Sequence, residues 1–285
     1  MGVKVSGDVK AVTLVLLWSA LGALGTLAYA TFFEKLFHAW LHNEEYSFGI
    51  LIPFLVAFPI WARRKKVRIA EESRWLPGLI LVVAGCVLQV FASRGGTLLL
   101  SGIAFVMTVS GIVGYLWGKK RLVLIMGPLA LLILMVPLPS YVVGQVSWYL
   151  QSAASTASGS VLGFLGVPVY QDGNLLRLSH YVLEVKQACS GSRSILALFA
   201  LAWALGMNMD SKYWVRVLLL LVTPILALGA NVIRIVGTGL IASEWGGLAA
   251  NESLHTIWGV IVFLIAVFGL VGIQTLLRRA VCKSA

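Results

Sequence analysis

The sequence predicts an all-α integral membrane protein with about eight transmembrane helices. Of its 285 residues, 59% are hydrophobic and only 12% are charged, and the mean hydropathy is +0.93. A soluble domain has roughly 45–50% apolar and about 25% charged residues. The basic residues also gather in alternate segments between apolar runs. We therefore interpret the net charge of +11 as lysine and arginine retained in cytoplasmic loops rather than as a surface for nucleic acid.

Eight apolar runs approach the length of about 20 residues that a membrane-spanning helix needs. The breakers RRKKVR, SRGG, GKKR and PLPS follow the second, third, fourth and fifth runs. The first run lacks the small-residue cleavage site of a signal peptide, so it counts as a span. The predicted spans are 12–33, 47–62, 76–93, 97–118, 121–138, 188–206, 214–242 and 254–277.

The distribution of basic residues orients these spans. With the amino terminus inside, the cytoplasmic segments hold most of the 22 lysines and arginines, and the exterior and its span ends hold only Lys35, Arg94, Arg177, Lys186, Arg193 and Arg234. Acidic residues lean toward the exterior. This is the positive-inside pattern, and it predicts that both termini are cytoplasmic. We expect one polytopic membrane domain over residues 1–285.

The outer loop 139–187 is predicted to contain structure of its own. Its first part, SYVVGQVSWYLQSAASTASGSVLGFLGVPV, is rich in small residues and moderately apolar, which favours a re-entrant or interfacial helix. After the turn QDGN, the segment NLLRLSHYVLEVK alternates like a short strand pair. This loop precedes Cys189.

Three chemically useful side chains are predicted to share one face and one membrane depth. Cys189 opens the sixth span from the outside, Arg234 lies in the outer third of the seventh, and His255 opens the eighth. A cysteine at a helix amino terminus is favoured as a thiolate. A histidine can accept and return its proton. An arginine within a span is costly and usually functional, for example as an oxyanion stabiliser.

Neighbouring residues extend this predicted site. Ser190 and Arg193 lie within one turn of Cys189, and Asn231 precedes Arg234 by three residues on the same helical face. Taken singly, a cysteine at a helix start is most often inert packing, and a histidine at a span end is usually an interface residue. Their convergence with an intramembrane arginine favours an active site.

Other groups carry weaker signals. His38 and His42 have the i, i+4 spacing of metal ligands, but only Glu44 and Glu45 are nearby as further ligands, so we predict no metal and no cofactor. Cys86 lies in mid-span and Cys282 in the basic tail, and both are interpreted as structural or incidental.

The motifs ACSGSRS, NVIRI and LHTIWG, in this order on three late spans, resemble the exosortase/archaeosortase family of membrane cysteine transpeptidases. The earlier block EEYSFGILIPFLVAFPIWARRKK is similar to the first conserved block of that family, in which a histidine is common where this chain has Phe48. The resemblance covers about residues 40–275. A histidine at position 255 favours the bacterial exosortase branch.

The resemblance implies a catalytic set in which Cys189 is the nucleophile, Arg234 the electrostatic stabiliser and His255 the acid and base. It implies substrate proteins anchored in the membrane by a carboxy-terminal sorting signal of the PEP-CTERM kind: a short motif, one transmembrane helix and a basic end. Cleavage would occur at the periplasmic or exterior face of the inner (cytoplasmic) membrane. The acceptor would be water or an amine on a lipid or glycan.

Two other function classes remain open from the sequence. A non-catalytic component of exopolysaccharide assembly or export would explain the spans and Arg234 but not the thiol and histidine. An acyltransferase that uses Cys189 as a transient acyl carrier would also have a reactive thiol, but it would be labelled with lipid rather than peptide. Arg177, Lys186 and Arg193 are candidates to read an acidic residue in a substrate motif. No nucleic-acid partner is expected.

Overall fold

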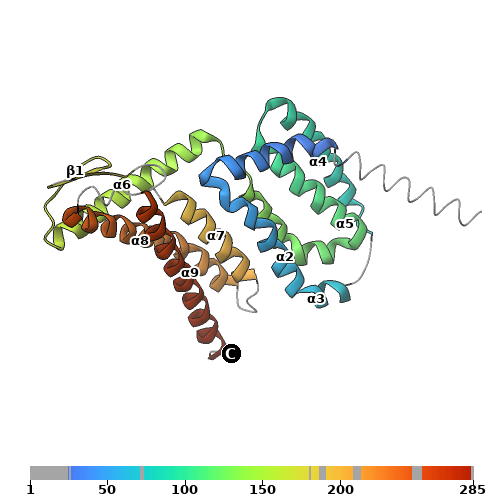
Figure 1. Cartoon of the computed structure of the whole chain (residues 1–285). Helices are drawn as coiled ribbons and strands as arrows, with labels where there is room; N and C mark the ends of the chain where they lie inside the picture. Colours follow the sequence, from blue (N-terminus) through green and yellow to red (C-terminus); the bar gives the residue numbers. More distant parts are fainter. Residues whose placement is uncertain are drawn as a thin grey trace, which may run out of the picture.

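The structure is a computed structural model, and the chain folds almost entirely into helices (Figure 1). The residues that it describes are 25, 27–70, 74–179, 181–185, 191–207, 213–245 and 252–283. At 245, 252–255 and 281–283 the description extends to the backbone only. The chain is mostly helical and apolar, as predicted for an all-α membrane protein.

Within these residues, five helical segments are long and apolar enough to cross a membrane. The sixth predicted span corresponds to the shorter apolar helix α7, Ser192–Met207. The first predicted span lies largely outside the described residues, although residues 27–42 are helical. The count of eight spans and the orientation of the termini therefore stay predictions. The five segments are Glu44–Ala62, Pro77–Gly95, Leu98–Met135, Tyr213–Glu244 and Thr256–Ala280.

Helix α5, Leu98–Leu131, combines two predicted spans in one bent element. Its bend is at Gly118, where φ is 88° and ψ is 163°. A positive φ costs glycine little because it has no Cβ, whereas other residues clash. The GKKR segment therefore interrupts the helix at its glycine, as the sequence predicted, but the basic residues after it are helical. The 3₁₀-helix η2, Leu132–Met135, completes the second arm.

The segment before the basic RRKKVR stretch is not one uniform helix. It begins as the 3₁₀-helix η1, Glu44–Leu51, and continues as α2, Ile52–Ala62. The side chain of Asn43 caps η1 by accepting a hydrogen bond from the Glu45 backbone N–H at 2.9 Å. Beyond α2 lie the short helix α3, Arg64–Ile69, and then α4, Pro77–Gly95, which ends before Gly96 at a φ of 67°.

The segment 139–187 contains the predicted helix, and it has one more strand than expected. Helix α6, Ser140–Phe164, packs against α8, Tyr213–Trp245. Three antiparallel strands follow, in the order β1–β2–β3. The turn at Gly173 joins β1 to β2, so the first strand precedes the turn, where the sequence analysis placed no strand. The strands are β1 Val169–Asp172, β2 Leu175–Leu178 and β3 Val182–Glu184.

Helix α7 lies between two groups of helices and contacts both. In Figure 1 the helices α2 to α5 lie on one side of it, and α6, α8, α9 and the sheet lie on the other. Helix α7 contacts η1, α2 and α5 as well as α8 and α9, Glu252–Lys283. Its contact with α8 and α9 is an apolar cluster around Leu198, Leu219 and Leu270, all fully buried. The helices that carry Arg193, Asn231, Arg234 and His255 are therefore packed against one another.

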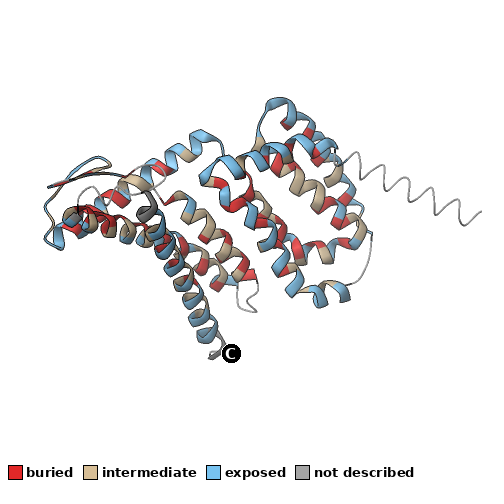
Figure 2. Cartoon of the chain, in the orientation of Figure 1, coloured by how far each residue is buried: buried red, intermediate tan, exposed pale blue. Residues whose placement is uncertain are grey.

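The outward faces of the helices are apolar. Buried residues lie where helices face each other, and exposed residues cover the outside of most helices, including α9 (Figure 2). Many of the exposed side chains are large hydrophobic ones, such as Phe54, Phe91 and Phe268. So large an apolar exterior would aggregate in water, whereas hydrocarbon chains can cover it. It is the exterior expected of a multi-pass membrane protein.

Candidate active site

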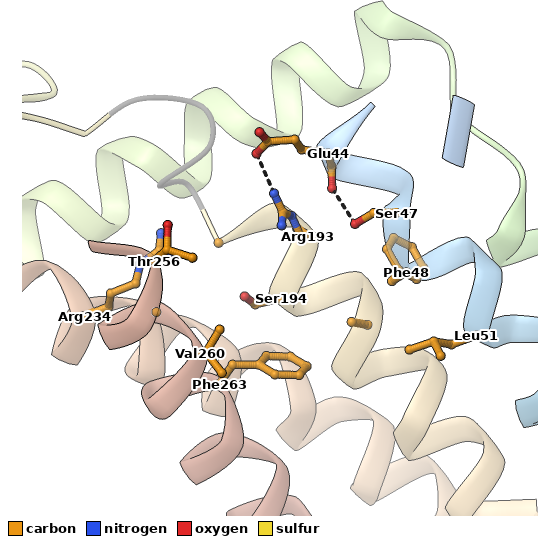
Figure 3. A pocket seen from close by; sticks show the side chains of 13 residues that line it. Glu44, Ser47, Phe48, Leu51, Arg193, Ser194, Arg234, Thr256, Val260 and Phe263 are labelled. Carbon is orange, nitrogen blue, oxygen red and sulfur yellow. Dashed lines mark hydrogen bonds and ion pairs between the residues drawn. The ribbon is translucent and has the colours of Figure 1, made fainter. Parts of the chain in front are cut away.

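A cavity of about 590 Å³ lies where η1, the start of α7, the middle of α8 and the start of α9 meet (Figure 3). Its walls combine polar and apolar side chains. The polar lining residues are Glu44, Ser47, Arg193, Ser194, Arg234 and Thr256. The apolar ones are Phe48, Leu51, Ala197, Val260 and Phe263.

Arg234 enters this cavity from α8 and is held by α9. Its backbone carbonyl accepts hydrogen bonds from Trp258 Nε1 at 3.1 Å and from Thr238 Oγ1 at 2.9 Å. Its side chain extends across Gly259, where an added Cβ would lie 3.5 Å from the Arg234 Cδ. In Figure 3 the Arg234 side chain reaches toward Thr256 at the start of α9. A cation is thereby fixed in the wall of a cavity between apolar helices.

The crossing of α8 and α9 depends on two glycines. Gly259 on α9 faces the Arg234 side chain, and Gly237 on α8 faces the Trp258 ring. A Cβ on Gly237 would lie 2.6 Å from Trp258 Cζ2 and Nε1, which is closer than real atoms approach. Small residues let helix backbones come close together, as is common between membrane helices. This close packing brings the indole N–H within reach of the Arg234 carbonyl.

The entry to α7 is fixed by Gly191 and Asn231. Gly191 has a φ of 82°, and its Cα faces the Asn231 side chain, whose Cγ would lie 3.1 Å from an added Cβ. Asn231 is buried, with 5% of its surface exposed. Together with Ser194 and Arg234, Asn231 also lines a second, much smaller space behind the cavity. Asn231 and Arg234 thus face the same region from one side of α8, as their three-residue spacing predicted.

An ion pair forms another part of the cavity wall. Arg193 Nη2 donates to Glu44 Oε2 at 2.8 Å (Figure 3). The backbone carbonyl of Glu44 also accepts a hydrogen bond from Ser47 Oγ at 3.0 Å. The two side chains are 45% and 80% exposed, and exposed pairs of this kind add only ~0.2–1 kcal/mol to stability. The pair is therefore weak, and its place at the cavity matters more than its contribution to folding.

A comparison with known protein families identifies the family of the chain. The family model described as transmembrane exosortase (Exosortase_EpsH) matches residues 40–272. The chain belongs to the transmembrane exosortase family. No curated protein and no solved structure matches it. Membership supports a general role as a membrane transpeptidase or protease.

The exosortase structure brings together three of the six predicted site residues. Arg193 and Arg234 line the cavity, and Asn231 lies just behind it. Cys189 and Ser190 lie outside the described residues. His255 belongs to α9, but its side chain also lies outside the description. Their positions in the site stay predictions.

Sequence reasoning missed Glu44 as a member of the site. It considered this residue only as a possible metal ligand beside His38 and His42. In the exosortase structure His38 and His42 stack, with ring centroids 4.2 Å apart, and the described residues contain no group of three or more His, Cys, Asp or Glu side chains that could hold a metal ion. The available signal was the early block EEYSFG, which also provides Ser47 and Phe48 to the cavity.

Proposed function

We propose that this exosortase cleaves a carboxy-terminal sorting signal of membrane-anchored substrate proteins at the extracytoplasmic face. The signal is of the PEP-CTERM kind, with a short motif, a transmembrane helix and a basic end. The chain acts as one polytopic domain of the inner membrane. Cys189 is the nucleophile, His255 the acid and base, and Arg234 the stabiliser of the oxyanion.

The cavity is the observation that carries this proposal. Gly191, two residues after Cys189, and Thr256, the residue after His255, both line it, and Arg234 lies in its wall. Consecutive Cα atoms are only ~3.8 Å apart, so the described neighbours of Cys189 and His255 are the part of the structure that supports their assignment to this cavity. Described residues from three sequence-distant segments thus line one space, and this supports the proposal that the thiol, the cation and the imidazole act there.

The chemistry requires a thiolate, an anion stabiliser and a proton donor. The Cys189 thiolate attacks the substrate carbonyl carbon, and Arg234 stabilises the negative oxygen that forms. The C–N bond then breaks, and His255, protonated by the thiol proton, gives that proton to the departing amine. The acyl group remains on sulfur as a thioester. Water or an acceptor amine attacks the thioester, loses a proton to His255, and releases Cys189.

A cleavage assay in cells tests the proposal. The protein is co-expressed with a tagged reporter that ends in Pro-Glu-Pro, an apolar helix and arginines, and the reporter size is followed by blotting. Cys189→Ala should abolish cleavage, and Arg234→Gln should slow it by about 10²–10³-fold, as the loss of an oxyanion donor does elsewhere. The control is Cys86→Ala, because Cys86 is an exposed thiol on α4 and should not affect cleavage.

Other outcomes separate the alternatives. Cleavage that persists in Cys189→Ala would contradict the thiol mechanism. It would favour the alternative of a non-catalytic role in polysaccharide assembly. The mass of the adduct on Cys189, trapped at low pH, distinguishes the remaining two. A peptide mass supports the transpeptidase, and a fatty-acyl mass supports the acyltransferase.

A further inference from the structure

We propose that Arg193 binds an acidic side chain of the substrate, and that Glu44 occupies this position on Arg193 until the substrate arrives. Glu44 would then be a specificity-determining residue that competes with the substrate for one guanidinium. The inference rests on the proposed function, because it takes the occupant of the cavity to be a peptide segment.

The position of the pair supports this role. Glu44 and Arg193 both line the cavity, and their side chains meet at 2.8 Å across it, one from η1 and the other from α7 (Figure 3). Arg193 is four residues from Cys189 in sequence. A side chain bound to Arg193 would therefore belong to a residue near the bond that is cut.

Glu44 and Arg193 differ in how strongly their positions in the helices favour an oppositely charged partner. Glu44 lies in the first turn of η1, where a negative charge is favourable, and Asn43 caps that turn. Arg193 is the second residue of α7, where the positive end of the helix makes a cation unfavourable. Arg193 therefore needs a nearby anion, whereas Glu44 is well placed without its partner. This asymmetry allows a different carboxylate to replace that of Glu44.

The exchange should be easy because both side chains are reached by solvent. Glu44 is 80% exposed and can rotate away, and Arg193 is 45% exposed and can accept a carboxylate from the cavity side. One carboxylate would replace another as the partner of Arg193, so the guanidinium keeps a negatively charged partner when substrate binds. Arginine binds carboxylates well because its planar donors match both oxygens.

The rest of the cavity indicates the class of occupant. Below the ion pair, the wall contains the apolar side chains of Leu51, Val260 and Phe263 on facing elements, beside the polar Ser194 and Arg234. A peptide segment with an acidic residue next to an apolar helix matches this order of surfaces. Arg177 is the alternative reader among the described residues, but it pairs with Asp172 on the hairpin at 3.5 Å and is absent from the cavity lining.

A binding experiment with purified full-length protein in nanodiscs tests this inference apart from catalysis. The probes are two short fluorescein-labelled peptides, one with Pro-Glu-Pro and the other with Pro-Gln-Pro, and affinity is read by fluorescence anisotropy. Wild type should prefer the Glu peptide by roughly threefold to tenfold, as one charged hydrogen bond at a solvent-reached site implies. Glu44→Gln should raise the affinity for the Glu peptide, because the competitor is gone.

Arg193→Gln should remove the preference, and Arg193→Lys should keep part of it. The matched control is Arg177→Gln, which breaks the exposed pair with Asp172 and should leave the preference unchanged. A wild type without Glu preference, or a preference lost in Arg177→Gln rather than in Arg193→Gln, overturns the inference.

The reporter assay keeps the two proposals distinguishable. Cleavage of Glu and Gln reporters at equal rates would retain the protease and reject the role of Arg193. The Glu peptide could bind in a way that depends on Arg193 while no reporter is cleaved. That result would support the role of Arg193 in binding an acidic residue and reject the proposed reaction. Thermal melting of each variant identifies any that fails to fold, and Arg193→Lys serves where Arg193→Gln does not.

Discussion

At Gly191 the chain enters α7 with a φ of 82°, and the Asn231 side chain leaves no ordinary space for a Cβ. Both features come from one residue, and both constrain the segment that follows Cys189 in sequence. A side chain here would have to adopt a left-handed backbone and also displace the Asn231 side chain. Gly191 therefore couples the start of α7 to Asn231 on α8, the helix that also carries Arg234.

Gly191→Ala should lower both stability and cleavage rate. The left-handed conformation alone costs a non-glycine residue about 1–2 kcal/mol. The control is Gly166→Ala, because Gly166 has nearly the same φ, 83°, but no atom within 4 Å of an added Cβ. Thermal melting and reporter cleavage should show a smaller stability loss for Gly166→Ala and little loss of activity. Equal effects of the two variants would mean that the contact with Asn231 is unimportant.

At the scale of the element, the crossing of α8 and α9 decides where Arg234 lies. The two glycines on this crossing differ in how much room they leave. An added Cβ on Gly237 would overlap the Trp258 ring at 2.6 Å, whereas one on Gly259 would only touch Arg234 Cδ at 3.5 Å. The helices thus interlock tightly at the tryptophan and less tightly at the arginine.

Gly237→Ala should be the more damaging substitution. Overpacking of this kind costs about 1–3 kcal/mol, and here it also displaces the indole that donates to the Arg234 carbonyl. Gly259→Ala should stay close to wild type in thermal stability. The double variant Gly237→Ala with Trp258→Leu restores space and should recover stability but not full activity. A double variant that does not recover stability would contradict this description of the crossing. A larger effect of Gly259→Ala than of Gly237→Ala would contradict it as well.

Elements with a local signal were predicted well from the sequence, and contacts between distant elements were not. The GKKR break appears as the bend at Gly118, and the small-residue helix appears as α6. The strand β1 was missed because its four residues have no clear alternation before the turn at Gly173. The pair of Arg193 with Glu44 joins residues 149 positions apart, and no periodicity reveals such a contact.

At the scale of the whole molecule, hydrogen bonds bring together segments that the charge pattern assigned to the same side. Arg121 Nε donates to the Ala70 carbonyl at 3.2 Å, and its Nη2 donates to the Arg68 carbonyl at 3.3 Å. These residues belong to two predicted cytoplasmic loops. In the same way Arg193 and Glu44, both predicted on the exterior, form an ion pair. The contacts agree with the positive-inside assignment without fixing its direction.

Accessibility labelling in whole cells determines that direction. In a background with all three cysteines replaced by serine, single cysteines are placed at Lys65 on α3 and at Arg177 on β2. A membrane-impermeant maleimide should label Arg177→Cys in intact cells, because the sheet is predicted to be outside. Lys65→Cys should react only after the membrane is opened, because the basic cluster is predicted to be cytoplasmic. The reverse pattern would place the cavity on the cytoplasmic side, where a carboxy-terminal signal exposed outside could not reach it.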